Sequence, residues 1–226
     1  MKRSASFIKI CSIFAVLCVL FSGCKSSNDK ILNEGIIEFD VTAVDPNHPW
    51  AGMIPSTATL KFKDDKFLME MSTMGMFTTT FICDQTNKTL TQMVKFLDIK
   101  QACIEKENEI KKENEGYQVK CEETKEIKTI AGYKCKKIKV KMVSDPTTSF
   151  EAYYTKDMGA ENMNELSPYI GIKGMLMQYR LKRMGLELQF VAKSVKKAEI
   201  TDNVFEIPAY FKIVSKAEIE KIFQQF

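Results

Sequence analysis

The sequence has one histidine, His48, and lacks the short motifs that common enzyme classes share. No G-x-S-x-G, C-x-x-C or H-E-x-x-H segment occurs, and there is no glycine-rich phosphate loop. His48 is preceded and followed by prolines in D-P-N-H-P-W, so we expect it in a turn rather than as a general base. The pair Asp64-Asp65 also fits a turn between two strands. We therefore expect a protein that is not an enzyme and has no cofactor.

The sequence also lacks a strong excess of charge of either sign. Its formal net charge is +4, and three of the positive charges, Lys2, Arg3 and Lys9, lie close to the N-terminus. The rest of the chain is therefore close to neutral. Nucleic-acid binding depends on a basic surface that neutralises phosphates. We expect no nucleic-acid partner.

No hydrophobic run is long enough to span a membrane as a helix. The longest apolar stretch, Ile10 to Phe21, is broken only by Ser12 and is about a dozen residues long. A spanning helix needs about 20 residues. Because Lys2, Arg3 and Lys9 precede this stretch, residues 1–23 are predicted to be an export signal.

The signal ends in L-F-S-G-C, where the small residues Ser22 and Gly23 directly precede Cys24. This segment resembles the lipobox of bacterial lipoproteins, in which the chain is cut before the cysteine. The cysteine of that family carries a diacylglyceryl group and usually an acyl chain. The alternative is an ordinary secreted protein in which Cys24 occurs by chance.

The lipobox resemblance implies a membrane partner, because two or more acyl chains attach a protein stably to a bilayer. Residues 24–33 would be the lipidated cysteine and a polar tether, and residues 34–226 a single folded domain. Lys25 follows the cysteine, which by resemblance to known sorting rules favours the outer membrane of the bacterial cell envelope.

Four cysteines remain after Cys24: Cys83, Cys103, Cys121 and Cys135. An oxidising compartment permits two disulfides among them, and free buried thiols are the alternative. Cys121 and Cys135 are symmetric about Lys128, so a hairpin turning there would place them opposite one another. The alternation of side chains is out of phase around Cys135, so this disulfide would require a bulge near Gly132 or Lys136.

Most of the chain after the tether alternates between apolar and polar residues, which is typical of half-buried strands. Short turns separate these segments, for example at Asp64-Asp65, at Asp84–Lys88 and at Gly185. A last strand is expected over Ala198–Ile207. The fold class predicted is mainly β (α+β), with one curved antiparallel meander sheet or open half-barrel.

Helices are expected to cover one face of this sheet. Ser215 and Glu218 form a capping-box pattern, after which Ile219, Ile222, Phe223 and Phe226 make one apolar stripe. This pattern predicts a C-terminal amphipathic helix that lies on the sheet. A second short helix is expected over Gly159–Leu166. The charged run Glu105–Glu115 is expected to be a solvated loop or an exposed helical turn.

Four methionines, Met69, Met71, Met74 and Met76, follow the pattern M-x-M-x-x-M-x-M. If the chain reverses at Ser72-Thr73, all four thioethers share one face, which suits Cu(I). Otherwise these flexible side chains line an apolar groove or fill the core. Met175 and Met177 favour the groove, because mobile side chains adapt to a variable lipid-like ligand.

Several blocks of the sequence resemble uncharacterised bacterial lipoproteins that contain domain of unknown function 4412. The blocks are GIIEFDVT, TLKFKDDKFLMEMSTMGMF, KTIAGYKCKK and VFEIPAYFKIVSKAEI. The strand-rich layout and the F-E-I-P segment are also similar to the half-barrel of the LolA and LolB lipoprotein carriers. That resemblance implies a hydrophobic ligand held between sheet and helices. The alternatives are a structural or interaction module with an envelope protein partner, and a Cu(I)-binding protein.

Overall fold

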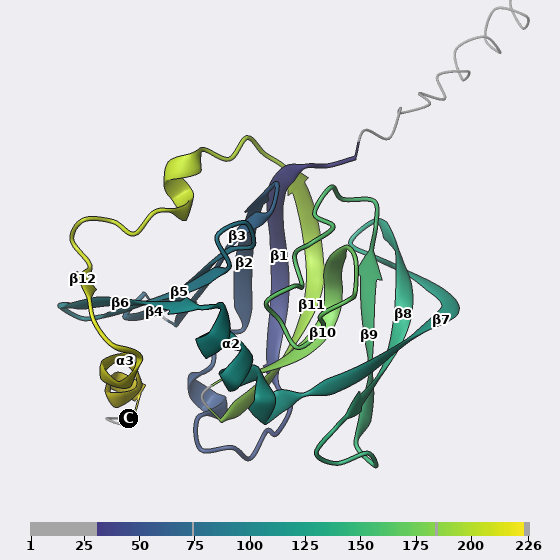
Figure 1. Cartoon of the computed structure of the whole chain (residues 1–226), viewed down its shortest axis with the longest axis horizontal. Coiled ribbons are helices and arrows are strands. Elements are labelled where there is room, and N and C mark those ends of the chain that lie inside the picture. The colour runs from purple at the N-terminus through teal and green to yellow at the C-terminus, as the bar shows by residue number, and fades with distance from the viewer. Residues whose placement is uncertain (1–30, 74, 184, 224–226) are drawn as a thin grey trace, which may run out of the picture. The chain divides into compact units, whose positions relative to one another are not determined.

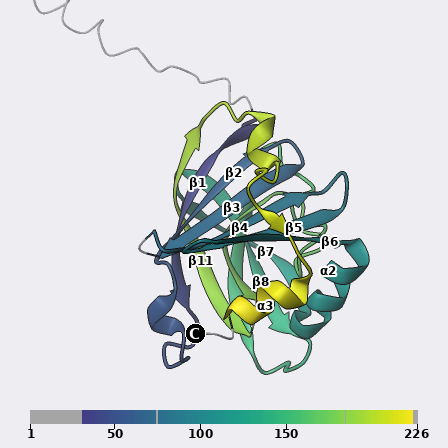
Figure 2. The same ribbon diagram turned by 90° about the vertical axis from the view of Figure 1, so that its left-hand side faces the viewer.

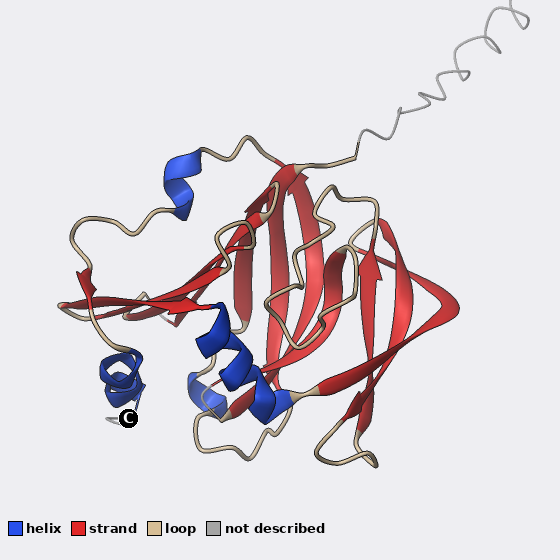
Figure 3. Cartoon of the chain, in the orientation of Figure 1, coloured by secondary structure: helices blue, strands red, loops and turns tan. Residues whose placement is uncertain are grey.

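The computed structural model describes residues 31–223 except for 74 and 184. The predictions for the signal, for Cys24, for Met74 and for Phe226 fall outside the described residues. Within the described part, the fold is mainly β, with a sheet of twelve strands and two short α-helices (Figures 1 and 3).

The bounds of the elements follow the alternating pattern of the sequence. The strands are β1 (Glu34–Ala43), β2 (Thr57–Lys63), β3 (Lys66–Thr73), β4 (Phe77–Asp84), β5 (Thr89–Phe96), β6 (Ile99–Lys106), β7 (Val119–Ile130), β8 (Tyr133–Met142), β9 (Ser149–Thr155), β10 (Met175–Arg183), β11 (Leu186–Lys197) and β12 (Lys212–Ile213). The α-helices are α2 (Glu107–Asn114) and α3 (Lys216–Phe223), and the 3₁₀ turns are η1 (Ala51–Met53), η2 (Glu115–Tyr117) and η3 (Asp202–Phe205).

The sheet is open and curved, in the order β12-β6-β5-β4-β3-β2-β1-β11-β10-β9-β8-β7. Two meanders, β1–β6 and β7–β11, join where β1 pairs antiparallel with β11. The short strand β12 pairs with β6 in the parallel sense, so the sheet is mixed rather than purely antiparallel. The predicted curved sheet is therefore confirmed in its general form, but it is not a single meander.

The core follows directly from the period-two pattern. In β1, Ile37 and Phe39 are fully buried, and they stand opposite Leu60 and Ala58 of β2. Val41 is opposite Phe190 of β11 on the other side of β1. Buried pairs on neighbouring strands stabilise a sheet through their mutual contact. These strands form the centre of the main hydrophobic cluster.

The C-terminal segment passes from one face of the sheet to the other around the β6 edge. Val204, Phe205, Ile207 and Phe211 pack against a cluster that includes Met93. Ile219 and Ile222 of α3 pack against a cluster that includes Val94, the next residue of β5. Successive residues of a strand point to opposite faces. Figure 2 looks onto this segment, which runs from η3 through β12 to α3.

Two features secure this wrapped segment. At the edge, Val214 N donates to Ala102 O at 2.8 Å, which continues the pairing of β12 with β6. At the start of α3, Ser215 N and Oγ donate to Glu218 Oε2 at 3.0 and 2.9 Å. The predicted helix start is therefore confirmed. Covering an edge strand also prevents its free backbone groups from pairing with another chain.

Two predicted elements are wrong, and a third is confirmed. Gly159–Leu166 contains turns and no helix, because the segment is ordered by tertiary contacts of Met163 and Leu166 rather than by a helical stripe. Residues 198–207 contain η3 instead of a strand. The charged run Glu105–Glu115 ends β6 and forms the short helix α2, whose single buried residue is Ile110, so the expected exposed helical form is confirmed.

Candidate functional site

The described residues enclose an apolar cavity of about 490 Å³ on the concave face of the sheet. Its walls come from β2, β3, β4 and β5 on one side and from β10 and β11 on the other. None of the described residues that line it is charged. A cavity of this size lies within the range of about 300–1,000 Å³ that is usual for small-molecule sites.

The strand pattern explains why the walls are apolar. Residues two apart on a strand point to the same face, and the lining residues follow this spacing. In β3 they are Phe67, Met69, Met71 and Thr73, in β4 Phe77, Thr79, Phe81 and Cys83, and in β11 Leu186, Leu188 and Phe190. One face of each of these three strands therefore supplies a large share of the cavity wall.

The opening lies where the chain turns between β1 and β2 and between β3 and β4. Met53 in η1 is 48% exposed and Met76 in the β3–β4 turn is 57% exposed, although both line the cavity. Thr73 Oγ1 donates to Met53 O at 3.0 Å and ties these two segments together. The cavity therefore reaches solvent through a rim that carries flexible thioether side chains.

The long loop between β9 and β10 closes another part of the cavity through Asn164, Leu166 and Tyr169. Asn164 is buried, and its Nδ2 donates to Ile172 O and Gly174 O, both at 2.8 Å. These bonds hold the loop in place without a helix. The structure thus uses a loop where the sequence predicted a helical cover.

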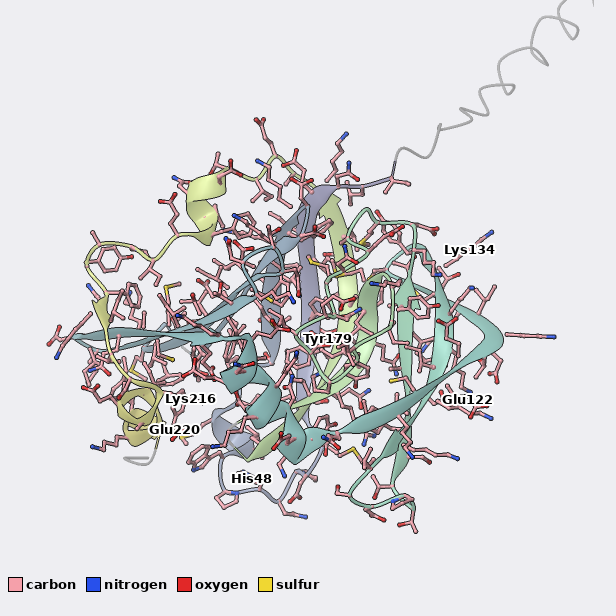
Figure 4. All side chains as sticks on the ribbon, in the orientation of Figure 1. His48, Glu122, Lys134, Tyr179, Lys216 and Glu220 are labelled. Atoms are coloured by element: carbon pink, nitrogen blue, oxygen red, sulfur yellow. The ribbon has the colours of Figure 1, made fainter. Side chains whose placement is uncertain are left out.

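An aromatic cluster forms the β10–β11 wall. Tyr179 stacks on Phe190 with ring centroids 5.0 Å apart. Phe39 and Tyr169 each meet Tyr179 edge-on, at 6.0 and 6.2 Å. Figure 4 labels Tyr179 in the interior of the sheet. Offset and edge-to-face contacts of this kind give a rigid wall.

The predicted groove residues are only partly brought together. Met69, Met71, Met76 and Met175 line the cavity. Met177 is fully buried in the core and does not line it, because the β9–β10 ladder is irregular between Leu176 and Gln178. The sequence pattern did not indicate the contributions of Trp50 or Tyr179.

The methionine hairpin predicted for Cu(I) has a different register. Thr73 pairs with Phe77, so the chain reverses between these two residues rather than at Ser72-Thr73. Met71 stands opposite Thr79 and Met69 opposite Phe81. The predicted reversal at Ser72-Thr73 is therefore wrong. Copper binding by Met69, Met71, Met74 and Met76 stays a prediction.

The predicted Cys121–Cys135 disulfide is not formed. Cys121 stands opposite Val140, and Cys135 stands opposite Lys128, because the hairpin reverses at Ala131 and Gly132. All four described cysteines are free thiols. The expected irregularity does occur near Lys136, on β7 between Glu123 and Ile127.

The histidine, cysteine and carboxylate side chains of the described residues are not clustered as metal ligands. No group of three or more His, Cys, Asp or Glu side chains in that part of the chain is placed to hold a metal ion. His48 lies in a turn, where its backbone oxygen accepts from Ala51 N at 2.8 Å.

Across residues 31–223 as described, no helix is both long and apolar enough to cross a membrane.

Comparison with known proteins does not assign this site. Neither a scan against protein-family models nor a search of the curated proteins finds a match for this chain. The function is therefore argued from the cavity itself.

Proposed function

We propose that this protein is a membrane-anchored envelope lipoprotein that binds a hydrophobic or lipid-like ligand and catalyses no reaction. The observation that supports the proposal is the uncharged cavity of about 490 Å³ between the curved sheet, the β9–β10 loop and α3. A core that needed no ligand would be filled by side chains at close-packed density. An apolar cavity of this volume can instead hold an apolar molecule and remove its surface from water.

The expected ligand is a single-chain amphiphile such as a fatty acid. Each methylene group that leaves water contributes about 0.8 kcal/mol, so affinity grows with the length of chain that enters. A charged head cannot be accommodated among the walls, since no charged described residue lines them. The head therefore stays at the opening near Met53 and Met76 while the chain enters. The methionines adapt the walls to chains of different shape.

Displacement of a fluorescent fatty-acid probe tests the binding. The full-length protein should bind the probe and release it when unlabelled fatty acid is added. Met71→Trp and Leu188→Trp fill the cavity from opposite walls and should abolish binding. Ile104→Trp is the matched control, because Ile104 is 45% exposed on β6 and does not line the cavity. Absence of probe binding by the unmodified protein rules out this function.

Metabolic labelling with a palmitate analogue tests the anchor separately. The label should appear on the unmodified protein and disappear in Cys24→Ala. Cys18→Ala is the control, because Cys18 lies within the predicted signal and should leave the label unchanged. Equal labelling of both variants contradicts lipidation at Cys24, whatever the cavity binds.

A further inference from the structure

The hydroxyl groups of the side chains that line the cavity divide into two sets. In the first set, each hydroxyl is already used by the protein. Ser167 Oγ donates to Asn164 O at 3.0 Å, and Tyr169 OH donates to Arg180 O at 2.6 Å. Tyr169 OH also accepts from Arg180 N at 3.2 Å. These groups complete the fold and offer little to a ligand.

Tyr179 belongs to the second set. It is 8% exposed and lines the cavity, and its hydroxyl makes no hydrogen bond with any residue that the structure describes. Burial raises the pKa of this phenol well above its ordinary value, so the hydroxyl stays protonated. The ring is fixed between Phe39, Tyr169 and Phe190. A neutral donor is therefore held in a set position on the wall.

Thr79 is the other member of the second set. It is 5% exposed on β4 and lines the same cavity from the facing group of strands. Its neighbours across the ladders are Met71 and Val94, neither of which offers a side-chain hydrogen bond to its hydroxyl. Within the described part of the chain, its hydroxyl has no partner.

Neither hydroxyl is among the fully enclosed side-chain atoms that lack a partner in the described residues, so both face the cavity space. An apolar occupant that encloses them without a hydrogen bond is costly, because most buried polar groups are hydrogen-bonded. By contrast, the hydroxyls of Ser167 and Tyr169 in the same cavity walls both have hydrogen-bond partners within the protein. Phenylalanine and valine would fill the places of Tyr179 and Thr79 with nearly the same volume and without that cost. The two hydroxyls are thus explained if the occupant of the cavity supplies their hydrogen bonds.

We propose that the ligand carries an oxygen part-way along its apolar chain, as a hydroxyl or carbonyl group, which Tyr179 and Thr79 bind. The inference rests on the proposed function, because it names the class of amphiphile that the cavity selects. A plain saturated chain leaves both hydroxyls without partners. A chain with a mid-chain oxygen accepts from one or both of them, and a ligand hydroxyl also donates.

Competition against the fluorescent probe tests this selection, with stearate and a series of its hydroxy and keto derivatives substituted at successive mid-chain positions. At one or two positions, the oxygenated chain should bind about fivefold more tightly than stearate, the gain of roughly one hydrogen bond. Tyr179→Phe should remove most of this preference, because it removes the hydroxyl and keeps the ring. Thr79→Val should reduce the preference further.

Tyr169→Phe is the matched control. It removes a hydroxyl from the same cavity wall, but one that is already bonded to Arg180. It should therefore lower the melting temperature and keep the ligand preference. Tyr179→Phe should leave the melting temperature of the ligand-free protein unchanged or raise it.

The two proposals fail in different ways. If neither stearate nor its derivatives displace the probe, or the probe itself does not bind, lipid binding is wrong. If stearate binds and no oxygenated derivative binds better at any position, the selection by Tyr179 and Thr79 is overturned while the proposed function stands. The same conclusion follows if Tyr179→Phe and Tyr169→Phe change the preference equally.

Discussion

Phe223, in the last described turn of α3, meets Phe77 of β4 edge-on, with ring centroids 5.3 Å apart. Both rings also line the cavity. The helix therefore does more than cover the β5–β6 end of the sheet, because its final turn forms part of the cavity wall. This contact links the position of α3 to access to the cavity.

Truncation of Phe223 should open the cavity. In Phe223→Ala the edge-to-face contact is lost and the wall beside Phe77 becomes wider. We expect the bound fatty-acid probe to dissociate severalfold faster, and the free energy of unfolding to fall by about 1–2 kcal/mol because Phe223 is only partly buried. Stopped-flow displacement of the probe measures the rate.

Phe205→Ala provides the control for this prediction. Phe205 is also partly buried, but it packs on the opposite face of the sheet. Its truncation should destabilise the protein to a similar extent and leave the dissociation rate unchanged. Equal acceleration in both variants would mean that general loosening of the fold, rather than the wall at Phe223, controls release.

Lys216 holds the first turn of α3 in place. Its Nζ lies 2.5 Å from Glu105 Oε1 and 2.6 Å from Glu113 Oε2, and Glu105 is 3% exposed. Burial lowers the pKa of Lys216, but the hydrogen bonds to the two carboxylates outweigh it, so the net pKa is raised. Lys216→Met should lower the free energy of unfolding by about 2 kcal/mol, because two carboxylates lose their neighbouring positive charge. Urea denaturation measures this change.

Lys221→Met is the matched variant on the same helix. Lys221 is exposed and forms no ion pair with any described residue, so its substitution should change stability by less than about 0.5 kcal/mol. If Lys216→Met is equally mild, the contact with Glu105 and Glu113 contributes little. Such a result would leave the packing of Ile219 and Ile222 as the main attachment of α3.

The β7–β8 turn should respond in opposite directions to two small substitutions. Ala131 and Gly132 have φ values of 49° and 86°, in the left-handed region that glycine tolerates best. Ala131→Gly should therefore stabilise the protein or leave it unchanged, and Gly132→Ala should destabilise it by about 1 kcal/mol. Thermal unfolding of the two variants shows whether their melting temperatures change in opposite directions. Equal effects would contradict the turn position.

Buried thiols should make the protein sensitive to alkali. Burial raises the pKa of Cys103, which is 2% exposed, from 9.0 to about 11. The unfolded chain therefore loses its thiol proton first as pH rises. The stabilising contribution of the protonated thiol is complete below pH 9 and is lost as pH rises to about 11, by about 1–2 kcal/mol.

Denaturation curves recorded from pH 8 to pH 11 measure this loss. The fall should be smaller in Cys103→Val, which has no titrating group at that site. Cys121 and Cys135 also have a pKa raised to about 11 by burial, so part of the fall remains in the variant. An unchanged curve in Cys103→Val would show that its thiol is not protected in the native state.

The sequence alone determined the general architecture, because side-chain alternation is a local property. The alternate spacing of Ile37, Phe39 and Val41 indicates a strand, regardless of which residues they pack against. The Ser215–Glu218 start of α3 is equally local, since both partners lie within one helical turn. The β7–β8 turn was not determined in this way: the sequence suggested a reversal at Lys128, whereas the pairing of β7 with β8 places it at Ala131 and Gly132.

The cavity was decided by tertiary structure. Met69 and Met175 are far apart in the sequence, and they line one cavity because β1 pairs with both β2 and β11 and so joins the two meanders. No local pattern specifies that pairing, or shows that Tyr169 bonds to Arg180 while Tyr179 is left without a partner among the described residues. Periodicity fixes which face of a strand is apolar, whereas only the three-dimensional path of the chain decides whether facing side chains meet or leave a space.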